Sequence, residues 1–289
     1  MDYFYIITNP QKDSHLETTH RVRNYLESHG KHCQVRTFEK ADASPEGNYK
    51  YTNADLIPKE TQCILVLGGD GTLIQAARDT LKLQIPLLGI NMGTLGYLAE
   101  IEKNNLEYAL DCLMADEYTV EERMMLQGRV FKGGAVISED YSLNDIVISR
   151  HGSLRIIQYD IYVNGAYLNS YSADGVIVAT PTGSTGYSLS AGGPIVSPRA
   201  AMTILSPICP HTLNTRSIVL SDEDRIQVKV GPGRGGQEED VLVTFDGKQG
   251  LLLEDGDYVE IEKAEQVTKI LKISNMSFLE VLRNKMREN

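Results

Sequence analysis

The sequence has no apolar run long enough to cross a membrane, and its start, MDYFYIITNP, lacks the basic and apolar regions of a secretion signal. Its four cysteines form no CxxC pair that would indicate a zinc site or a redox motif. Positive charge is also scarce, because 28 Lys and Arg against 39 Asp and Glu give a formal net charge of -11. These deficits argue against a membrane or a nucleic acid as the main partner and favour a cytoplasmic protein with free thiols.

Strand and helix patterns alternate over the first 118 residues. Apolar runs typical of buried parallel strands stand at 3–8, 63–69 and 85–91, and a further strand is predicted at 32–38. Amphipathic stretches predict helices at 14–30, 72–81 and 104–114. The length of 289 residues suits two domains. The alternation predicts a doubly wound, Rossmann-like α/β domain over residues 1–118.

After residue 118 the sequence carries mostly strand signals. Apolar and other residues alternate over 157–163, and Asn164-Gly165, a typical hairpin turn, follows. We therefore predict an all-β, sandwich-like domain over residues 119–264. The last segment, 265–289, is predicted to return to the first domain through a helix.

Helix starts are predicted where Ser or Thr is followed three residues later by Glu or Gln, the spacing of a capping box. This spacing occurs at Ser14–Glu17, Thr72–Gln75 and Ser277–Glu280. Gly30 is placed to end the first of these helices.

The stretch GGDGT, residues 68–72, lies between a predicted strand and a predicted helix. Glycines at such a junction let a ligand approach the backbone, and the start of a helix favours phosphate. A carboxylate such as Asp70 is unfavourable there unless it accepts a proton or holds a cation, as phosphoryl transfer requires. A turn whose Asp70 merely caps the helix is the alternative.

A second candidate is the uncharged loop 181–190, which is rich in Gly, Ser and Thr. Its N–H and O–H donors suit a nucleotide or a phosphate, and Tyr187 is placed to stack on a base or close the pocket. It is not a Walker A loop, because no Lys follows a glycine there. The alternative is a flexible surface loop.

Three further features give weaker signals. Asn144-Asp145 offers an amide and a carboxylate suited to paired ribose hydroxyls, although such dipeptides mostly form turns. GPGRGG at 231–236 matches GxGxxG, but an acidic loop and a strand follow it, so we predict a hairpin loop. His151 and His211 lack partners at metal-ligand spacing and are predicted to be structural or exposed.

In this order the motifs resemble those of the NAD kinase family. The matching segments are GGDGT (68–72), NMGTLGYL (91–98), LND (143–145), DGVIVATPTGSTGYSLSAGGPI (174–195), ICPHTL (208–213) and FDG (245–247). GGDGT is shared with lipid kinases and phosphofructokinases, whereas the TPTGSTGYSLSAGGP segment is more specific. The resemblance implies transfer of the ATP γ-phosphate to the adenosine 2′-hydroxyl of NAD, giving NADP, and an NAD-binding β domain.

Site residues are carried over from the family by position. Asp70 would accept the proton, and Gly71 would let the substrate lie close. Asn144 and Asp145 would hold the ribose on the nicotinamide side, although the family often has Glu at the second position, and Asp174 would lie near the nicotinamide. The other implied contacts are Thr182, Thr185, Gly186, Tyr187, Ser188, Leu189 and Ser190 for adenine and phosphate, Gly68, Gly69 and Thr72 in the phosphate turn, and Arg155 as a variable substrate contact.

This chain departs from the family after FDG, where many relatives have Gln. Here Lys248 stands in that place and Gln249 follows. This difference puts in question whether the residue after FDG contacts the substrate as it does in the family. It also affects the expected tolerance for polyphosphate as donor and the expected feedback by NADPH.

The resemblance also implies cofactors and partners. The donor would be ATP with Mg²⁺ or another divalent cation, held by phosphates and water rather than by a protein metal site. Polyphosphate is an alternative donor, and a homodimer or homotetramer is expected. Two alternatives stay open: a lipid kinase, although NMGTLGYLAE replaces its usual Gly-Thr-x-Asn-Asp run, and a module that senses NAD(H) without turnover, against which the intact Asp70 counts.

Overall fold

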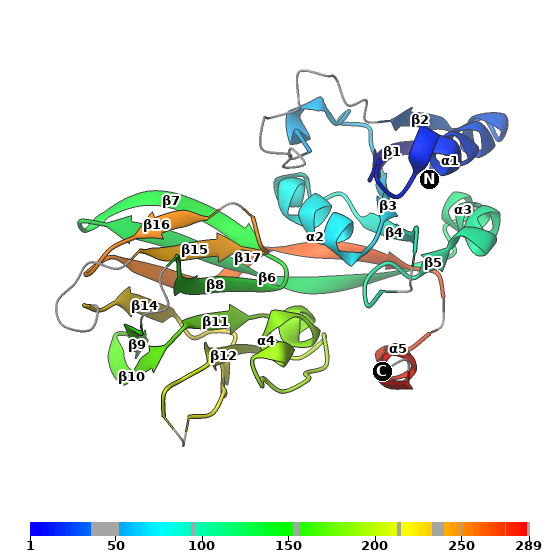
Figure 1. Cartoon of the computed structure of the whole chain (residues 1–289). Helices are drawn as coiled ribbons and strands as arrows, with labels where there is room; N and C mark the ends of the chain where they lie inside the picture. Colours follow the sequence, from blue (N-terminus) through cyan, green and yellow to red (C-terminus); the bar gives the residue numbers. More distant parts are fainter. Residues whose placement is uncertain are drawn as a thin grey trace. The chain divides into compact units, whose positions relative to one another are not determined.

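The structure is a computed structural model that describes residues 1–35, 52–93, 96–152, 156–212, 215–232, 240–248, 250–274 and 276–287. It divides into two compact units: unit 1 holds Met1–Glu122 with Val267–Asn289, and unit 2 holds Arg123–Gln266 (Figure 1). Within the described residues, no helix is long and apolar enough to span a bilayer.

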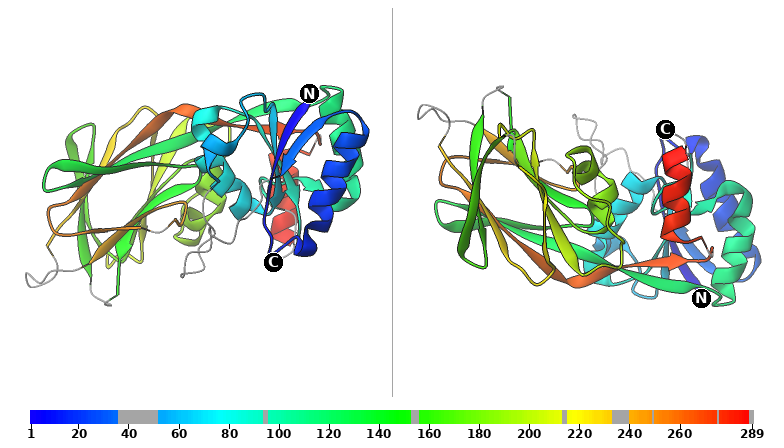
Figure 2. Two further views of the ribbon diagram at one scale, coloured as in Figure 1. Left: turned by 90° about the horizontal axis from the view of Figure 1, so that it is seen from above. Right: turned by 90° about the horizontal axis from the view of Figure 1, so that it is seen from below.

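Unit 1 is built on a parallel sheet with the strand order β2-β1-β3-β4-β17, and β5 pairs with β4. Its strands are β1 (Tyr3–Thr8), β2 (His32–Val35), β3 (Cys63–Gly68), β4 (Leu87–Asn91), β5 (Ile101–Glu102) and the end of β17 (Tyr258–Lys272). Its helices are α1 (Glu17–Ser28), α2 (Asp70–Asp79), α3 (Leu106–Met114) and α5 (Phe278–Arg287). Figure 2 shows α1 and α3 together on one face of this sheet and α2 on the other. The predicted doubly wound α/β fold is confirmed, while residues 36–38 of the predicted second strand lie outside the described residues.

The strand order of unit 1 contains a topological switch point between β1 and β3. From β1 the chain passes through α1 to β2 on one side, whereas from β3 it passes through α2 to β4 on the other. In open α/β sheets, ligands bind outside the carboxyl ends of the strands at such a point. The loops that follow β1 and β3 are therefore the expected binding loops of unit 1.

The predicted capping box at Ser14–Glu17 is wrong. Helix α1 begins at the end of that segment, and Asp13 caps it by accepting hydrogen bonds from the N–H groups of Thr18 (3.0 Å) and Thr19 (2.8 Å). A short aspartate before the helix reaches the same free N–H groups that the Ser14 hydroxyl was expected to reach. The predicted end is confirmed, since Gly30 takes φ +74° just after the helix.

The other two predicted helix starts differ in outcome. Helix α2 begins at Asp70, two residues before the predicted Thr72, and its N-cap is a glycine without a capping side chain. The box at the last helix is confirmed, because the N–H of Ser277 donates to Glu280 Oε2 at 2.8 Å and the N–H of Glu280 donates to Ser277 Oγ at 3.3 Å. Helix α5 lies in unit 1 and buries Val281.

Unit 2 consists of two antiparallel sheets that share one core. One has the order β10-β9-β14-β17, with β6 paired to β17 and β7 to β6, and the other has the order β13-β12-β11-β8-β15-β16. The strands are β6 (Thr119–Lys132), β7 (Ala135–Ser142), β8 (Asp145–Arg150), β9 (Ile157–Val163), β10 (Ala166–Ala173), β11 (Gly175–Ala179), β12 (Met202–Ile208), β13 (Ile218–Ser221), β14 (Ile226–Val230), β15 (Val241–Phe245) and β16 (Leu251–Leu253). Buried side chains from both sheets, such as Ile148 and Tyr159, belong to the same cluster. The mostly-β, sandwich-like prediction is confirmed.

Two loops of unit 2 were singled out from the sequence. The hairpin between β9 and β10 is confirmed, because Asn164 and Gly165 take φ +52° and +80°, as a type I′ turn requires. Of the predicted loop 231–236, residues 233–236 lie outside the described residues. The described helical turns of unit 2 are two short ones, η6 (Thr182–Thr185) and α4 (Tyr187–Ser190).

Candidate functional site

The GGDGT turn lies at the carboxyl end of β3, beside the switch point of unit 1. Strand β3 is an apolar run whose six residues are all buried, and it ends at Gly68, one residue before the N-cap of α2. A Cβ on Gly68 would overlap the side chain of Thr72, so the turn closes only with glycine there. A Cβ on Gly71 would meet no atom within 4 Å, so the turn is open at the position where the substrate is expected to come close.

The carboxylate of Asp70 does not cap its own helix but is held by a second segment. Its oxygens accept hydrogen bonds from three consecutive N–H groups: Oδ2 from Tyr97 at 2.7 Å, and Oδ1 from Leu98 and Ala99 at 3.1 Å each. An ionised carboxylate has about four acceptor positions, so these donors orient Asp70 and leave one direction for a hydroxyl. The side chain is only partly buried, and a ligand can therefore reach it.

Sequence reasoning missed two residues that build this turn. Gly96 faces Asp70 so closely that a Cβ there would overlap the carboxylate. Asn9, in the loop after β1, donates from Nδ2 to Thr72 Oγ1 at 3.3 Å. The NMGTLGYL motif contained the signal for Gly96, since a glycine was quoted there without a role, whereas the contact of Asn9 depends on the fold.

In unit 2, the Asn144-Asp145 turn is fixed by a carboxylate that sequence reasoning also left without a role. Asp246, in the FDG motif, accepts hydrogen bonds from three consecutive N–H groups: those of Leu143 (2.7 Å), Asn144 (2.8 Å) and Asp145 (3.1 Å). Its backbone has φ +49°, the left-handed region that Asp tolerates better than most residues. The FDG motif therefore works as the support of the LND motif.

The loop after β11 packs against the same turn. The N–H of Thr180 donates to the Asn144 carbonyl oxygen at 2.8 Å, and a Cβ on Gly183 would overlap that carbonyl. A Cβ on Gly186 would lie 3.4 Å from Asn144 Nδ2 and 3.9 Å from Asp145 Oδ2. The structure thus brings together three of the predicted residues of unit 2: Asn144, Asp145 and Gly186.

This corner of unit 2 holds polar atoms without partners. Asn144 Oδ1 is buried and has no hydrogen bond within the described part of the chain. The side chain of Asp145 is also buried, and this burial, followed by the charge of Asp246, raises the pKa of Asp145 to about 7. Buried acceptors without donors are costly in a folded protein, and ligand hydroxyl groups would supply those donors.

The remaining predicted residues of the loop take different positions. Thr182 and Ser188 are buried, and the Ser188 hydroxyl lies 3.4 Å from Ser206 Oγ, inside the fold. The side chains of Tyr187, Leu189 and Ser190 are exposed. Thr185 is partly buried and donates to the carbonyl oxygen of Thr182 at 3.4 Å.

Two further predicted contacts, Asp174 and Lys248, form ion pairs in unit 2. Asp174, between β10 and β11, pairs with Arg150 at 3.0 Å. Lys248 pairs with Asp140 at 2.8 Å and is only partly exposed. Arg155 lies outside the described residues.

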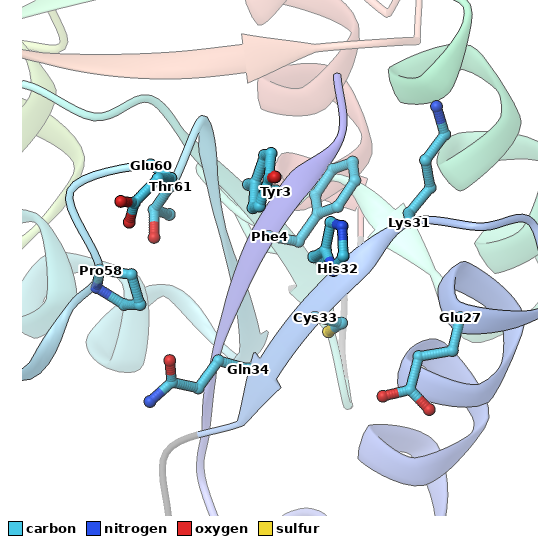
Figure 3. A pocket seen from close by; sticks show the side chains of 10 residues that line it. All are labelled: Tyr3, Phe4, Glu27, Lys31, His32, Cys33, Gln34, Pro58, Glu60 and Thr61. Atoms are coloured by element: carbon cyan, nitrogen blue, oxygen red, sulfur yellow. The ribbon is translucent and has the colours of Figure 1, made fainter.

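Unit 1 also contains a cavity of about 360 Å³ that the sequence did not indicate (Figure 3). Its lining includes Tyr3 and Phe4 of β1, His32 of β2 and Thr61 before β3. These residues stand at the amino ends of the parallel strands, whereas GGDGT follows the carboxyl end of β3. The cavity is therefore separate from the predicted phosphate turn.

Comparison with known proteins identifies the family. Residues 4–118 match the ATP-NAD kinase N-terminal domain, and residues 143–273 match the ATP-NAD kinase C-terminal domain. The chain is 45% identical to the NAD kinase of Lachnospira eligens over 99% of this chain and 100% of that protein. It is 46% identical to the NAD kinase of Agathobacter rectalis over 99% of each.

Solved structures agree with the sequence comparison. A yeast NADH kinase complexed with NADH superposes with a TM-score of 0.84 at 26% identity, covering 100% of this chain and 88% of that one. An NAD kinase from Archaeoglobus fulgidus in complex with ATP gives 0.75 at 25% identity, covering 99% of each chain. The α/β unit with its GGDGT turn and the mostly β unit define a phosphotransferase. More particularly, the chain belongs to the NAD kinase family.

Proposed function

We propose that this protein transfers the γ-phosphate of ATP to the 2′-hydroxyl of the adenosine ribose of NAD, giving NADP, with Asp70 as the general base. Membership of the NAD kinase family supports the reaction. The observation that carries the assignment of the base is the Asp70 carboxylate, oriented by three backbone N–H groups with one acceptor direction left.

The reaction needs a base because a ribose hydroxyl is a poor nucleophile at neutral pH. As the bond from O2′ to the γ-phosphorus forms, the bond from that phosphorus to the bridging oxygen of ADP breaks, and the hydroxyl proton passes to Asp70. Such proton transfer is typically worth about 10²- to 10⁴-fold in rate. Positioning and charge stabilisation supply the rest.

We propose that NAD contacts the Asn144-Asp145 turn of unit 2 and the loop after β11 that packs against it. Asn144 Oδ1, for which the described part of the chain offers no donor, and the buried Asp145 carboxyl suit the ribose hydroxyls on the nicotinamide side. Asp174 is proposed for the nicotinamide end, and Gly71 for close approach at the turn of unit 1. The adenine and phosphate contacts are proposed as Thr182, Thr185, Gly186, Tyr187, Ser188, Leu189 and Ser190, with Arg155 and Lys248 as variable contacts.

ATP is the proposed donor, accompanied by Mg²⁺, and polyphosphate is an alternative donor. No group of three or more His, Cys, Asp or Glu that could hold a metal ion occurs among the described residues. The proposed Mg²⁺ would be carried by the donor phosphates and water with at most one or two carboxylates, and the ion would offset phosphate charge. The four free cysteines of the protein favour a cytoplasmic location. A homodimer or homotetramer stays a prediction.

The test is formation of NADP from NAD and Mg-ATP by the purified protein, with Asp70→Asn and the exposed control Glu60→Gln. We expect turnover by the wild type and the control, and a fall in kcat of about 10²- to 10⁴-fold for Asp70→Asn with NAD binding retained. NAD binding without product from ATP or polyphosphate would overturn the kinase assignment and favour a sensor. If neither binding nor turnover is seen, lipid acceptors become the next substrates to test.

A further inference from the structure

Lys12 lies in the loop that follows β1, on the other side of the switch point from GGDGT. The N–H of Lys12 donates to the Asn9 carbonyl oxygen at 3.0 Å, and the N–H of Asn9 donates to the Leu67 carbonyl oxygen at 2.9 Å. Since Asn9 also donates from its side chain to Thr72, this loop is bonded to both ends of the GGDGT turn. The position of Lys12 relative to the turn is therefore fixed by the backbone around it.

The side chain of Lys12 extends over Gly69. A Cβ on Gly69 would lie 2.7 Å from Lys12 Nζ, closer than any ordinary contact. Gly69 has φ -122° and ψ -170°, an extended conformation that any residue adopts. Backbone strain therefore does not explain glycine at this position, whereas room for the ammonium group does.

The ammonium of Lys12 has no hydrogen bond or ion pair within the described ranges, and its side chain is exposed. Two other lysines of unit 1 are paired: Lys31 with Asp2 at 2.6 Å and Lys272 with Glu100 at 2.5 Å. The carboxylate nearest in sequence, Asp13, is occupied by the start of α1. Lys12 thus presents a free positive charge beside the turn.

We propose that Lys12 binds the phosphate chain of the ATP donor, and that Gly69 lacks a side chain so that the ammonium can reach this position. A lysine ammonium is a compact charge that binds phosphate oxygens well. In a chain of net charge -11, a local cation offsets the repulsion that a polyphosphate meets. This inference rests on the proposed function, because it assigns a donor contact to the same site.

The first test compares Lys12→Ala, Lys12→Arg and the control Lys82→Ala, which removes an exposed lysine beyond the far end of α2. We expect kcat/KM for ATP to fall about 10- to 100-fold in Lys12→Ala, with partial recovery in Lys12→Arg and no change in the control. The Kd for NAD should stay unchanged in all three. An unchanged KM and kcat for ATP in Lys12→Ala, with the wild type active, would overturn the inference and leave the proposed function standing.

A second test uses Gly69→Ala, whose methyl group would displace the ammonium. We expect it to weaken ATP use as Lys12→Ala does, and the double variant to be no worse than the single ones, because both changes remove one contact. Additive losses would contradict the contact.

Binding of tripolyphosphate, measured by calorimetry, does not depend on turnover. We expect wild type to bind it and Lys12→Ala to bind it at least about 10-fold more weakly. If the wild type makes no NADP, the proposed function fails, and this measurement alone decides the role of Lys12: equal binding by both proteins, or none by either, refutes it.

Discussion

Asp145 and Asp246 are joined in both directions: the N–H of Asp246 donates to the Asp145 carbonyl oxygen at 3.0 Å, and the N–H of Asp145 donates to Asp246 Oδ1 at 3.1 Å. This contact holds the buried carboxyl group of Asp145 near the half-buried carboxyl group of Asp246. Burial, and then the charge of Asp246, raises the pKa of Asp145 to about 7. We therefore expect the charge of Asp145 to change near neutral pH, with consequences for stability as well as for binding.

Asp145→Asn should stabilise the protein at high pH. The pKa of Asp145 is about 7 in the folded protein and 3.8 in its ordinary state. The protonated carboxyl therefore contributes its full stabilisation below pH 3.8, and this contribution to the free energy of unfolding is lost as pH rises through 7. Asn keeps the shape without the charge, so its free energy of unfolding should exceed that of the wild type at pH 8. Urea unfolding should show that the difference in free energy of unfolding between Asp145→Asn and the wild type becomes smaller as pH falls from 8 to 5. A difference that stays constant with pH would contradict the prediction. The exposed control Asp255→Asn should show no such trend.

Removing the Asp246 carboxylate should disorder the LND turn. Asp246→Ala leaves three N–H groups of residues 143–145 without their acceptor, at a cost of about 1–3 kcal/mol in the free energy of unfolding. We expect KM for NAD to rise while KM for ATP changes little, and Asp246→Asn, which keeps one acceptor oxygen, to give an intermediate value. Equal changes in both KM values would show general unfolding instead of a local effect.

Gly96→Ala should impair catalysis through Asp70. The added methyl group would overlap the carboxylate and turn it away from the N–H groups of residues 97–99. We expect kcat to fall about 10²- to 10⁴-fold, as for loss of the base, with NAD binding retained. Gly93→Ala is the matched control, because a Cβ there meets no atom within 4 Å. Similar losses in both variants would refute the role of Gly96.

Thr180→Ala should weaken the contact between the two loops of unit 2 that are proposed to bind NAD. The Thr180 hydroxyl donates to the Leu143 carbonyl oxygen at 2.6 Å and accepts from the N–H of Gly183 at 3.1 Å. Losing both bonds should cost about 1–3 kcal/mol in the free energy of unfolding and raise KM for NAD. Thr180→Ser keeps the hydroxyl and should retain the wild-type KM, so a raised KM in both variants would point to the lost methyl group.

The elements of unit 1 were predictable because their periodicity is strong. Strand β3 is apolar throughout and is buried at every position, and the box at Ser277–Glu280 forms as its spacing predicts. The starts of α1 and α2 were not predictable from spacing alone. At α1 an aspartate outside the expected box reaches the free N–H groups, and at α2 the glycine turn lets the helix begin two residues earlier.

For the candidate site, motifs indicated which residues matter but not what each one touches. The sequence places Asn144 next to Asp145, yet the support from Asp246 comes from about 100 residues away in the chain. Likewise Lys12 and Gly69 meet only because β1 and β3 are neighbours in the sheet. Such contacts depend on strand order, which local patterns do not encode.

The burial of β3 also restricts the motion of the GGDGT turn. Gly68, the last residue of the buried strand, accepts a hydrogen bond at 2.8 Å from the N–H of Met92 after β4. Amide hydrogens in such a strand exchange with solvent only when much of the unit opens. We therefore expect the turn to be anchored to a slowly exchanging part of unit 1. With the three N–H groups of residues 97–99 already bonded to its carboxylate, Asp70 is oriented before any nucleotide arrives, and binding need not supply the free energy to order it.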